Sequence, residues 1–142
     1  MIIAGILRQK NAPVICVEAD YTVRQAVFIL HEARIGAVLV LEGDRLAGLF
    51  SERDLVRLLA QEGESVLEAH VGDVMSTDLI TLSPEQSCAD AMALMTNQRI
   101  RHLPVLEAGQ LIGIVSIGDL VKHRIEEIES EAEQLKAYIT AG

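Results

Sequence analysis

The apolar positions of this chain follow the same order twice. Each time a short apolar run (14–17, then 79–82) comes before a segment whose apolar residues are three and four apart. This pattern predicts a strand followed by an amphipathic helix. Two further apolar runs follow each helix, 37–41 with 46–50 and 103–106 with 111–115, joined by short turns that contain glycine. Each pair predicts a β-hairpin.

Hydroxyl side chains mark the expected helix starts. Thr22 stands three residues before Gln25, and Ser87 three residues before Asp90, which is the spacing at which a hydroxyl accepts from a free backbone N–H. A second helix is expected to begin at Ser51 in one half and at Ser116 in the other. Each half therefore predicts a β-α-β-β-α unit.

The two halves are copies of one another. When the chain is shifted by 65 residues, positions 14–57 align with 79–122 without a gap, and 13 of these 44 positions are identical. A gap-free match of this length indicates an internal repeat. A unit of this size buries too little surface to be stable alone, so we expect the two to pack sheet to sheet about a pseudo-twofold axis.

The predicted fold is therefore α/β, of the α+β kind, with tandem repeats and a C-terminal helix. Its parts are an N-terminal helical segment at 1–13, repeat 1 at 14–60, a linker at 61–73, repeat 2 at 74–124, and an amphipathic helix at 125–142.

An apolar seam marks the last part of the chain. Its members recur at steps of four and three: Val121, Ile125, Ile128, Ala132, Leu135 and Ile139. This spacing is typical of a coiled-coil heptad. The helix either lies exposed on its own domain, or pairs with another subunit or covers a neighbouring sheet.

Charge and composition exclude several classes of protein. The 142 residues carry 21 acids and 12 bases, for a net charge of −9, and only 3% are aromatic. A nucleic-acid partner needs clustered bases and stacking aromatics, so we do not expect one. Arg8 and Lys10 interrupt the apolar start, which is too short for a membrane span. We therefore expect a soluble cytoplasmic protein without a membrane partner.

The cysteines and three of the histidines predict no chemistry. Cys16 and Cys88 are far apart and form no metal motif, so we expect two buried free thiols and no metal site. His31, His70 and His123 are expected to be surface residues.

The most specific repeated feature is a Ser-x-x-Asp segment after a glycine-containing strand. It places Ser51 with Asp54 in the first copy and Ser116 with Asp119 in the second. The spacing is close to that of a capping box, which would explain it structurally. It also fits a nucleotide site, because a helix N-terminus favours phosphate and a carboxylate beside it can accept from ribose hydroxyls.

A basic cluster stands before the hairpin of the second repeat. Arg99, Arg101 and His102 lie here, whereas the first repeat has Gly36 and Ala37 at the positions of Arg101 and His102. The repeat architecture therefore does not require these charges. A surface salt-bridge cluster would contribute little, so a clamp for a di- or triphosphate explains them better.

At this point the sequence resembles the paired cystathionine-β-synthase (CBS) domain, or Bateman module. The resemblance covers nearly the whole chain and rests on the two segments 48–54 and 113–119, on Val71-Gly-Asp-Val-Met75, and on Arg99-Ile-Arg-His-Leu-Pro-Val105. Together they look like the small stand-alone CBS-pair signal-transduction proteins of bacteria and plant mitochondria.

The resemblance implies up to two clefts between the repeats that bind adenosine-containing ligands such as AMP, ADP, ATP, NAD or S-adenosylmethionine. It assigns ribose hydroxyls to Asp54 and Asp119, and phosphate or ribose to Ser51 and Ser116. Phosphate would be neutralised by Arg101 and His102, with help from Arg99. The adenine would be held around Pro13 and Val14 and around 77–80, including Thr77 and Ile80.

The resemblance also implies a homodimer that reports ligand occupancy to a protein partner in trans, without catalysis and without a required cofactor. Two other functions stay open. The chain could be a dimerisation scaffold whose Ser and Asp pairs only cap helices, or a weak nucleotide-hydrolysing enzyme that uses His102 near Asp119.

Overall fold

The computed structural model describes residues 1–141, so Gly142, the last residue of the predicted C-terminal helix, lies outside it. The chain forms two compact units. The repeat-1 unit is Pro13–Ile80, and the repeat-2 unit combines Met1–Ala12 with the chain from Thr81 onward. The N-terminal segment therefore belongs with the second repeat.

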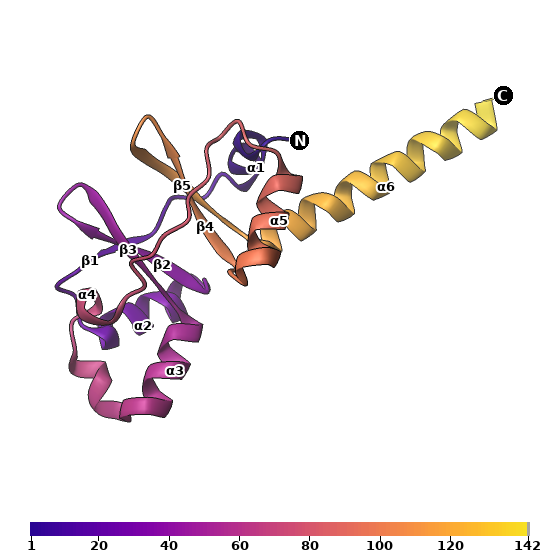
Figure 1. The fold of residues 1–142 in the computed structure, drawn as a ribbon. Coiled ribbons are helices and arrows are strands. Elements are labelled where there is room, and N and C mark those ends of the chain that lie inside the picture. Colours follow the sequence, from indigo (N-terminus) through magenta and orange to yellow (C-terminus); the bar gives the residue numbers. More distant parts are fainter. Residues whose placement is uncertain (142) are drawn as a thin grey trace. The chain divides into compact units, whose positions relative to one another are not determined.

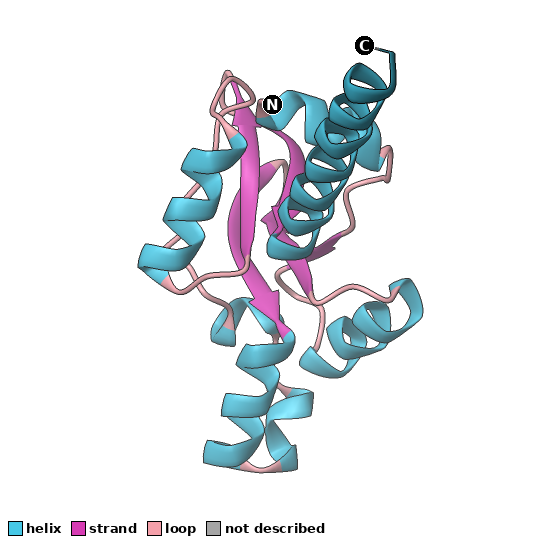
Figure 2. Cartoon of the chain, turned by 90° about the vertical axis from the view of Figure 1, so that its right-hand side faces the viewer, coloured by secondary structure: helices cyan, strands magenta, loops and turns pink. Residues whose placement is uncertain are grey.

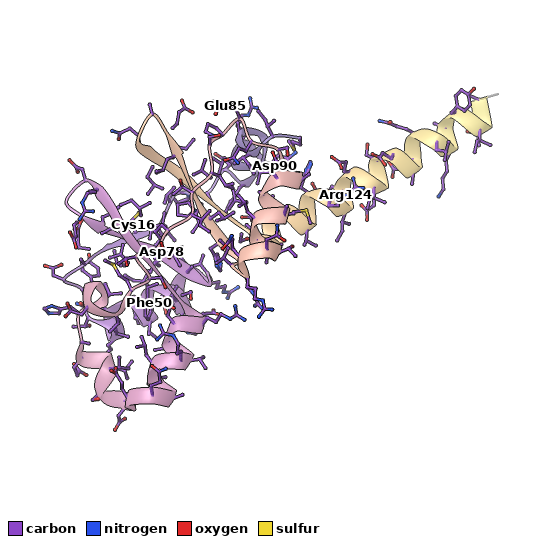
Figure 3. All side chains as sticks on the ribbon, viewed as in Figure 1. Cys16, Phe50, Asp78, Glu85, Asp90 and Arg124 are labelled. Atoms are coloured by element: carbon purple, nitrogen blue, oxygen red, sulfur yellow. The ribbon has the colours of Figure 1, made fainter. Side chains whose placement is uncertain are left out.

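The repeat-1 unit has the predicted β-α-β-β-α order (Figure 1). Its elements are β1 (Cys16–Glu18), α2 (Val23–Ala33), β2 (Ala37–Glu42), β3 (Arg45–Ser51) and α3 (Glu52–Glu62), followed by a 3-10 helix (Glu64–Glu68) and α4 (Val71–Val74). Strand β2 lies in the middle of the sheet, parallel to β1 and antiparallel to β3. Phe50 of β3, labelled in Figure 3, is fully buried in the core.

The repeat-2 unit repeats this order with one strand fewer. It contains α1 (Ile3–Lys10), α5 (Cys88–Gln98), β4 (His102–Glu107), β5 (Gln110–Ser116) and α6 (Ile117–Ala141). The prediction of a strand at 79–82 is wrong. This segment forms only a single parallel bridge, between Leu82 and Val105. In repeat 1 the Ala19 N–H extends the pairing to the Leu41 carbonyl at 3.0 Å. Pro84 holds the matching position and has no N–H to donate.

The predicted helix starts are confirmed. The Thr22 hydroxyl accepts from the Gln25 N–H at 3.1 Å, and the Gln25 side chain accepts from the Thr22 N–H at 2.8 Å. The Ser87 hydroxyl accepts from the Asp90 N–H at 3.0 Å. At the opposite ends of these two helices, Arg34 and Arg99 both adopt the left-handed conformation with φ of 55°.

Each unit is completed by a segment that lies outside its own repeat. The Ile3 N–H donates to the Gln86 carbonyl at 2.9 Å in the repeat-2 unit. The Val71 N–H donates to the Tyr21 carbonyl at 2.7 Å in the repeat-1 unit. Ile3 and Val71 are both fully buried, so these segments supply core side chains.

The segment predicted as a linker, 61–73, is folded. It includes the 3-10 helix and most of α4, and Val66 and Val71 join the buried core with Leu58. Sequence reasoning missed this because the isolated apolar residues of a short 3-10 helix produce no regular period.

Helix α6 joins two elements that were predicted separately. It runs without a break from Ile117 to Ala141, from the β5 junction to the end of the described chain (Figures 1 and 2). Its many charged residues set it apart from a membrane helix. No helix within residues 1–141 has both the length and the apolar character needed to cross a bilayer.

The buried N-terminal segment leads to a stability prediction. We expect Ile3→Ala to lower the free energy of unfolding by about 2–5 kcal/mol, because it leaves a cavity in the core of the repeat-2 unit. Ile2→Ala is the matched control, since the Ile2 side chain is 44% exposed. Urea unfolding measures the loss, and hydrogen exchange should show faster opening of β4 and β5 than of β2 and β3. Equal effects of the two substitutions would contradict this placement of α1.

Candidate functional site

The junction of β3 and α3 positions Ser51 and Asp54. The Ser51 hydroxyl accepts from the Asp54 N–H at 3.3 Å, and the Asp54 Oδ2 accepts from the Ser51 N–H at 3.0 Å and from its hydroxyl at 3.1 Å. This is a capping box, so the structural explanation of the motif is confirmed in this repeat. The Asp54 side chain is only 13% exposed.

A residue that the sequence did not single out also contacts this carboxylate. The Ser76 hydroxyl lies 3.4 Å from Asp54 Oδ1, and Arg57 Nη2 lies 3.4 Å from the same oxygen. Ser76 is held there by two backbone hydrogen bonds of 2.9 Å with Leu49. The only signal for it in the sequence was its position directly after the Val71–Met75 motif and before the predicted residue Thr77.

Gly48 allows this close approach. A Cβ at position 48 would lie 2.4 Å from Met75 Sδ and 2.8 Å from the Ser76 carbonyl oxygen. The glycine of the predicted motif thus lets the chain after α4 lie directly against β3, which places Ser76 beside Asp54.

The second copy of the junction has a different neighbour. The Ser116 N–H donates to Asp119 Oδ2 at 2.9 Å, and the Ser116 hydroxyl accepts from the Asp119 N–H at 3.1 Å. The Lys10 ammonium also donates to Asp119 Oδ2 at 2.9 Å and to the Ile114 carbonyl at 3.1 Å. Sequence reasoning missed Lys10 because it lies more than a hundred residues away.

The Asp119 carboxyl has a perturbed pKa. Its partial burial would raise the pKa, but the hydrogen bond from the Ser116 N–H and the ammonium of Lys10 outweigh this effect. The net result is a pKa below the ordinary aspartate value, so Asp119 is ionised at neutral pH.

Asp119 lines a cavity in the repeat-2 unit. The cavity has a volume of about 360 Å³ and is lined by Ile6, Gln9, Lys10, Asp119, Lys122, His123 and Glu126. The expectation that His123 is a surface residue is wrong, since its side chain is only 13% exposed. Its Nε2 lies 3.3 Å from Glu127 Oε2, one turn further along α6. The lining thus combines two ammonium groups, from Lys10 and Lys122, with two carboxylates, from Asp119 and Glu126, and Lys10 is paired with Asp119.

The backbone of the basic cluster lies at the start of α6. The Arg101 carbonyl accepts from the Ile117 N–H at 2.8 Å, and His102 pairs with Ser116 across the hairpin. The structure thus brings Arg101, His102 and Ser116 together. Arg99 caps the C-terminal end of α5, three residues before β4 begins, and it is exposed.

The equivalent place in the repeat-1 unit is a hollow of about 640 Å³. It is lined by Leu30, His31, Glu32, Arg34, Ile35, Gly36 and Glu52. The Gly36 carbonyl accepts from the Glu52 N–H at 3.0 Å, as Arg101 does for Ile117 in the other repeat. Gly36 thus lines the hollow at the position that Arg101 holds in the second repeat.

The predicted site residues therefore form two groups. Ser51, Asp54, Thr77 and Ile80 belong to the repeat-1 unit, and Arg99, Arg101, His102, Ser116 and Asp119 belong to the repeat-2 unit. Thr77 is exposed and Ile80 is half-buried. The shared ligand cleft between the two repeats stays a prediction.

The two thiols differ in burial. Cys88 is buried as predicted, whereas Cys16 is only half-buried. Burial, reinforced by Glu18, raises the pKa of the Cys16 thiol. Burial also raises the pKa of Cys88, against the opposing charge of the N-terminal amine. Both residues are therefore poor nucleophiles at neutral pH. Within residues 1–141, no group of His, Cys, Asp and Glu side chains is arranged to hold a metal ion.

The Lys10 contact leads to a prediction about pH. We expect Lys10→Met to raise the pKa of Asp119 toward the ordinary aspartate value. It should also lower the free energy of unfolding at neutral pH by roughly 0.5–1 kcal/mol. Because the folded pKa is the lower one, this stabilisation is present at neutral pH and is lost as the pH falls below about 4 through the folded pKa.

Carboxyl-resolved NMR titration measures this pKa, and urea unfolding at several pH values measures the stability. Lys122→Met is the control, because it removes an ammonium from the same cavity but keeps the one that is bonded to Asp119. An Asp119 pKa that is the same with and without Lys10 would show that the contact does not form in solution.

Comparison with known proteins gives a family for this chain. A model of the CBS domain matches residues 6–61 and 71–126. The chain is 41% identical over 128 residues to the mitochondrial CBS domain-containing protein CBSX3 of Arabidopsis thaliana. That match covers 87% of this chain and 62% of the plant protein, so the chain spans less than two thirds of the length of that relative.

Solved structures agree with this result. The CBS-domain containing protein ATU1752 from Agrobacterium tumefaciens has a TM-score of 0.85 and 36% identity, over 87% of this chain and 99% of that chain. The CBS domain protein PAE2072 from Pyrobaculum aerophilum, solved in complex with AMP, has a TM-score of 0.75 and 24% identity, over 84% and 89% of the two chains. At this lower identity the likeness shows the fold alone. From the two matched domains and these relatives, the chain belongs to the CBS domain family, as a tandem CBS pair.

Proposed function

We propose that this chain is a non-catalytic regulatory module that binds an adenosine-containing nucleotide. The observation that carries the proposal is the cavity beside Asp119, which contains the ionised carboxylate of Asp119 and the ammonium groups of Lys10 and Lys122. A carboxylate that only caps a helix needs no such cavity. The AMP complex of the Pyrobaculum aerophilum protein supports this class of ligand.

The chemistry of ribose suits the two cap carboxylates. A carboxylate has two oxygens that can accept hydrogen bonds from two neighbouring hydroxyls. Asp119 keeps its charge at neutral pH because its pKa is lowered, so these bonds would be charge-assisted. Asp54 has the same position in the first repeat, where Ser76 and Thr77 would lie near the ligand.

The cationic groups suit a phosphate. Lys10 and Lys122 line the cavity, and Arg101 and His102 lie at the start of α6. The N-terminus of a helix adds a favourable field for an anion. The first repeat has Gly36 in place of Arg101, so we expect its phosphate affinity to be lower. Arg99 would assist from the end of α5.

A regulatory role needs a response to occupancy. We propose that the chain forms a homodimer that a protein partner reads, with the ligand preferring one arrangement of the module over another. Only such a difference in affinity can shift the population of arrangements. The ligand class comprises AMP, ADP, ATP, NAD and S-adenosylmethionine. Cytoplasmic location is part of the same proposal.

One observation argues against an enzyme. The matched family model is that of a CBS domain and not of a catalytic family. The dimerisation scaffold remains the second candidate, because the capping box of Ser51 and Asp54 shows that the motif has a structural use.

A substitution cycle tests the ribose contact. We expect Asp119→Asn to weaken AMP binding by roughly 10–100-fold, because it removes charge-assisted bonds to the ribose hydroxyls. Isothermal calorimetry with AMP and with 2′-deoxy-AMP measures the effect. Loss of the 2′-hydroxyl should weaken binding to the original protein but have little further effect on the variant, since both changes remove the same bond.

Asp44→Asn is the matched control, because Asp44 is an exposed residue of the β2–β3 turn. It should leave binding unchanged. Equal responses of the two Asn variants, or equal losses from 2′-deoxy-AMP in all proteins, would contradict the ribose assignment.

A thermal-shift panel separates the module from the scaffold. A ligand at about 100 times its dissociation constant should stabilise the folded protein by about 2.7 kcal/mol. We expect at least one of the five adenosyl compounds to raise the melting temperature of the protein by several degrees. No shift with any of them at millimolar concentration would favour the scaffold.

A further inference from the structure

Helix α6 carries an apolar seam that nothing in its own unit covers. The exposed fractions of its large members are 42% for Val121, 50% for Ile125, 49% for Ile128, 60% for Leu135 and 67% for Ile139. Ala132 completes the seam and is also exposed. Single exposed apolar residues are ordinary, but a continuous row at heptad spacing is the signature of a helix–helix contact.

The repeat-2 unit uses the opposite side of the helix. Leu120 is 1% exposed, and the side chains of His123 and Glu127 are 13% and 34% exposed. These residues recur at steps of three and four on the side away from the seam. Packing of α6 against its own unit therefore leaves the seam pointing outward. Arg124, at the edge of the seam, is labelled where α6 passes beyond α5 in Figure 3.

The second half of α6 has no tertiary support within the described chain. Every residue from 128 to 141 is exposed, and Figure 1 shows this part of the helix running away from the rest of its unit. A helical segment as short as 128–141 is only marginally stable alone in water. A partner along the seam would supply the missing burial.

We propose that α6 pairs with α6 of a second copy of this chain in a parallel, in-register, two-stranded coiled coil. The seam places Ile125, Ala132 and Ile139 at one core position of the heptad and Val121, Ile128 and Leu135 at the other. In register, each seam residue meets its own counterpart on the second copy.

The charges beside the seam favour the parallel direction. In a parallel pair, the residue directly before each member of the Ile125, Ala132 and Ile139 set faces the residue five positions later on the other helix. Arg124 then faces Glu129 of the second copy, and Glu131 faces Lys136, and each contact occurs twice by symmetry. All four contacts join opposite charges.

The antiparallel direction brings like charges together. With the same seam residues matched end to end, Glu131 faces Glu131, Glu129 faces Glu129, and Lys122 faces Lys136 of the second copy. Like-charge contacts destabilise helix pairs. The same charges also favour two helices over more, because larger bundles bury the positions beside the seam, which here are occupied by Lys, Arg and Glu.

The parallel pair has a consequence for the cap sites. Val121 is two residues beyond Asp119, and paired helix axes lie about 8–10 Å apart. The two copies of the Asp119 junction would therefore lie at the same end of the coiled coil. The proposal itself does not depend on nucleotide binding, and its test contains no nucleotide.

Disulfide crosslinking of the full chain tests the pairing directly. In a background of Cys16→Ala and Cys88→Ala, we expect Leu135→Cys to become a covalent dimer under mild oxidation, because this seam position faces itself across a parallel pair. Gln134→Cys is the matched control, since Gln134 is the residue next to Leu135, is also exposed, and lies outside the seam. It should stay monomeric on a non-reducing gel.

Charge reversal in the Leu135→Cys protein tests the direction. Glu131→Lys and Lys136→Glu should each slow crosslinking by about threefold to tenfold, because each creates two like-charge contacts. The double variant should restore the original rate. An antiparallel pair predicts the opposite for Lys136→Glu, which would then remove repulsion from Lys122.

Four results would overturn the proposal. They are no crosslinking of Leu135→Cys, equal crosslinking of Gln134→Cys, faster crosslinking of Lys136→Glu alone, and a sedimentation mass above that of a dimer for the unmodified chain.

Discussion

The strand-to-helix junction is the interaction on which the rest of this molecule depends. One hydroxyl and one carboxylate, Ser51 with Asp54 or Ser116 with Asp119, satisfy the free N–H groups where a hairpin ends and a helix begins. In the second copy, the bond from the Ser116 N–H and the Lys10 ammonium also lower the pKa of Asp119, so the contacts that cap the helix keep the carboxylate of the proposed ribose site ionised. They also set where α6 starts, and with it the line of the exposed seam.

The two CBS domains share this framework but differ in what surrounds it. Lys10 meets Asp119 in one unit, whereas Arg57 and Ser76 meet Asp54 in the other. Gly36 lines a hollow at the position that Arg101 holds in the second repeat. Capping requires only the Ser and the Asp of each junction. The charges that would select a ligand come from other positions, which can differ between the repeats without loss of the cap. A duplicated scaffold can therefore carry two sites of different affinity.

Much of the fold was predictable from the sequence. The repeat order, the hairpins and the caps at Thr22, Ser51, Ser87 and Ser116 follow from local periodicity and from hydroxyl spacing, and the structure confirms them. The prediction of a strand at 79–82 was wrong, because Pro84 cannot donate the ladder hydrogen bond that Ala19 donates in the first repeat. The folded segment around Val66 and Val71 was not predicted, because its few apolar residues do not recur at a helical or strand period.

The sequence by itself determined the duplicated unit, the cap residues and the apolar seam of α6, because each depends on residues close together in the chain. Only the tertiary structure decided that α1 completes the second repeat, that Lys10 contacts Asp119, and that His123 is largely buried where it lines the cavity beside Asp119. These contacts join segments about a hundred residues apart or depend on which face of a helix its unit covers. No local pattern encodes such pairings, because they arise when the folded units bury their apolar surface.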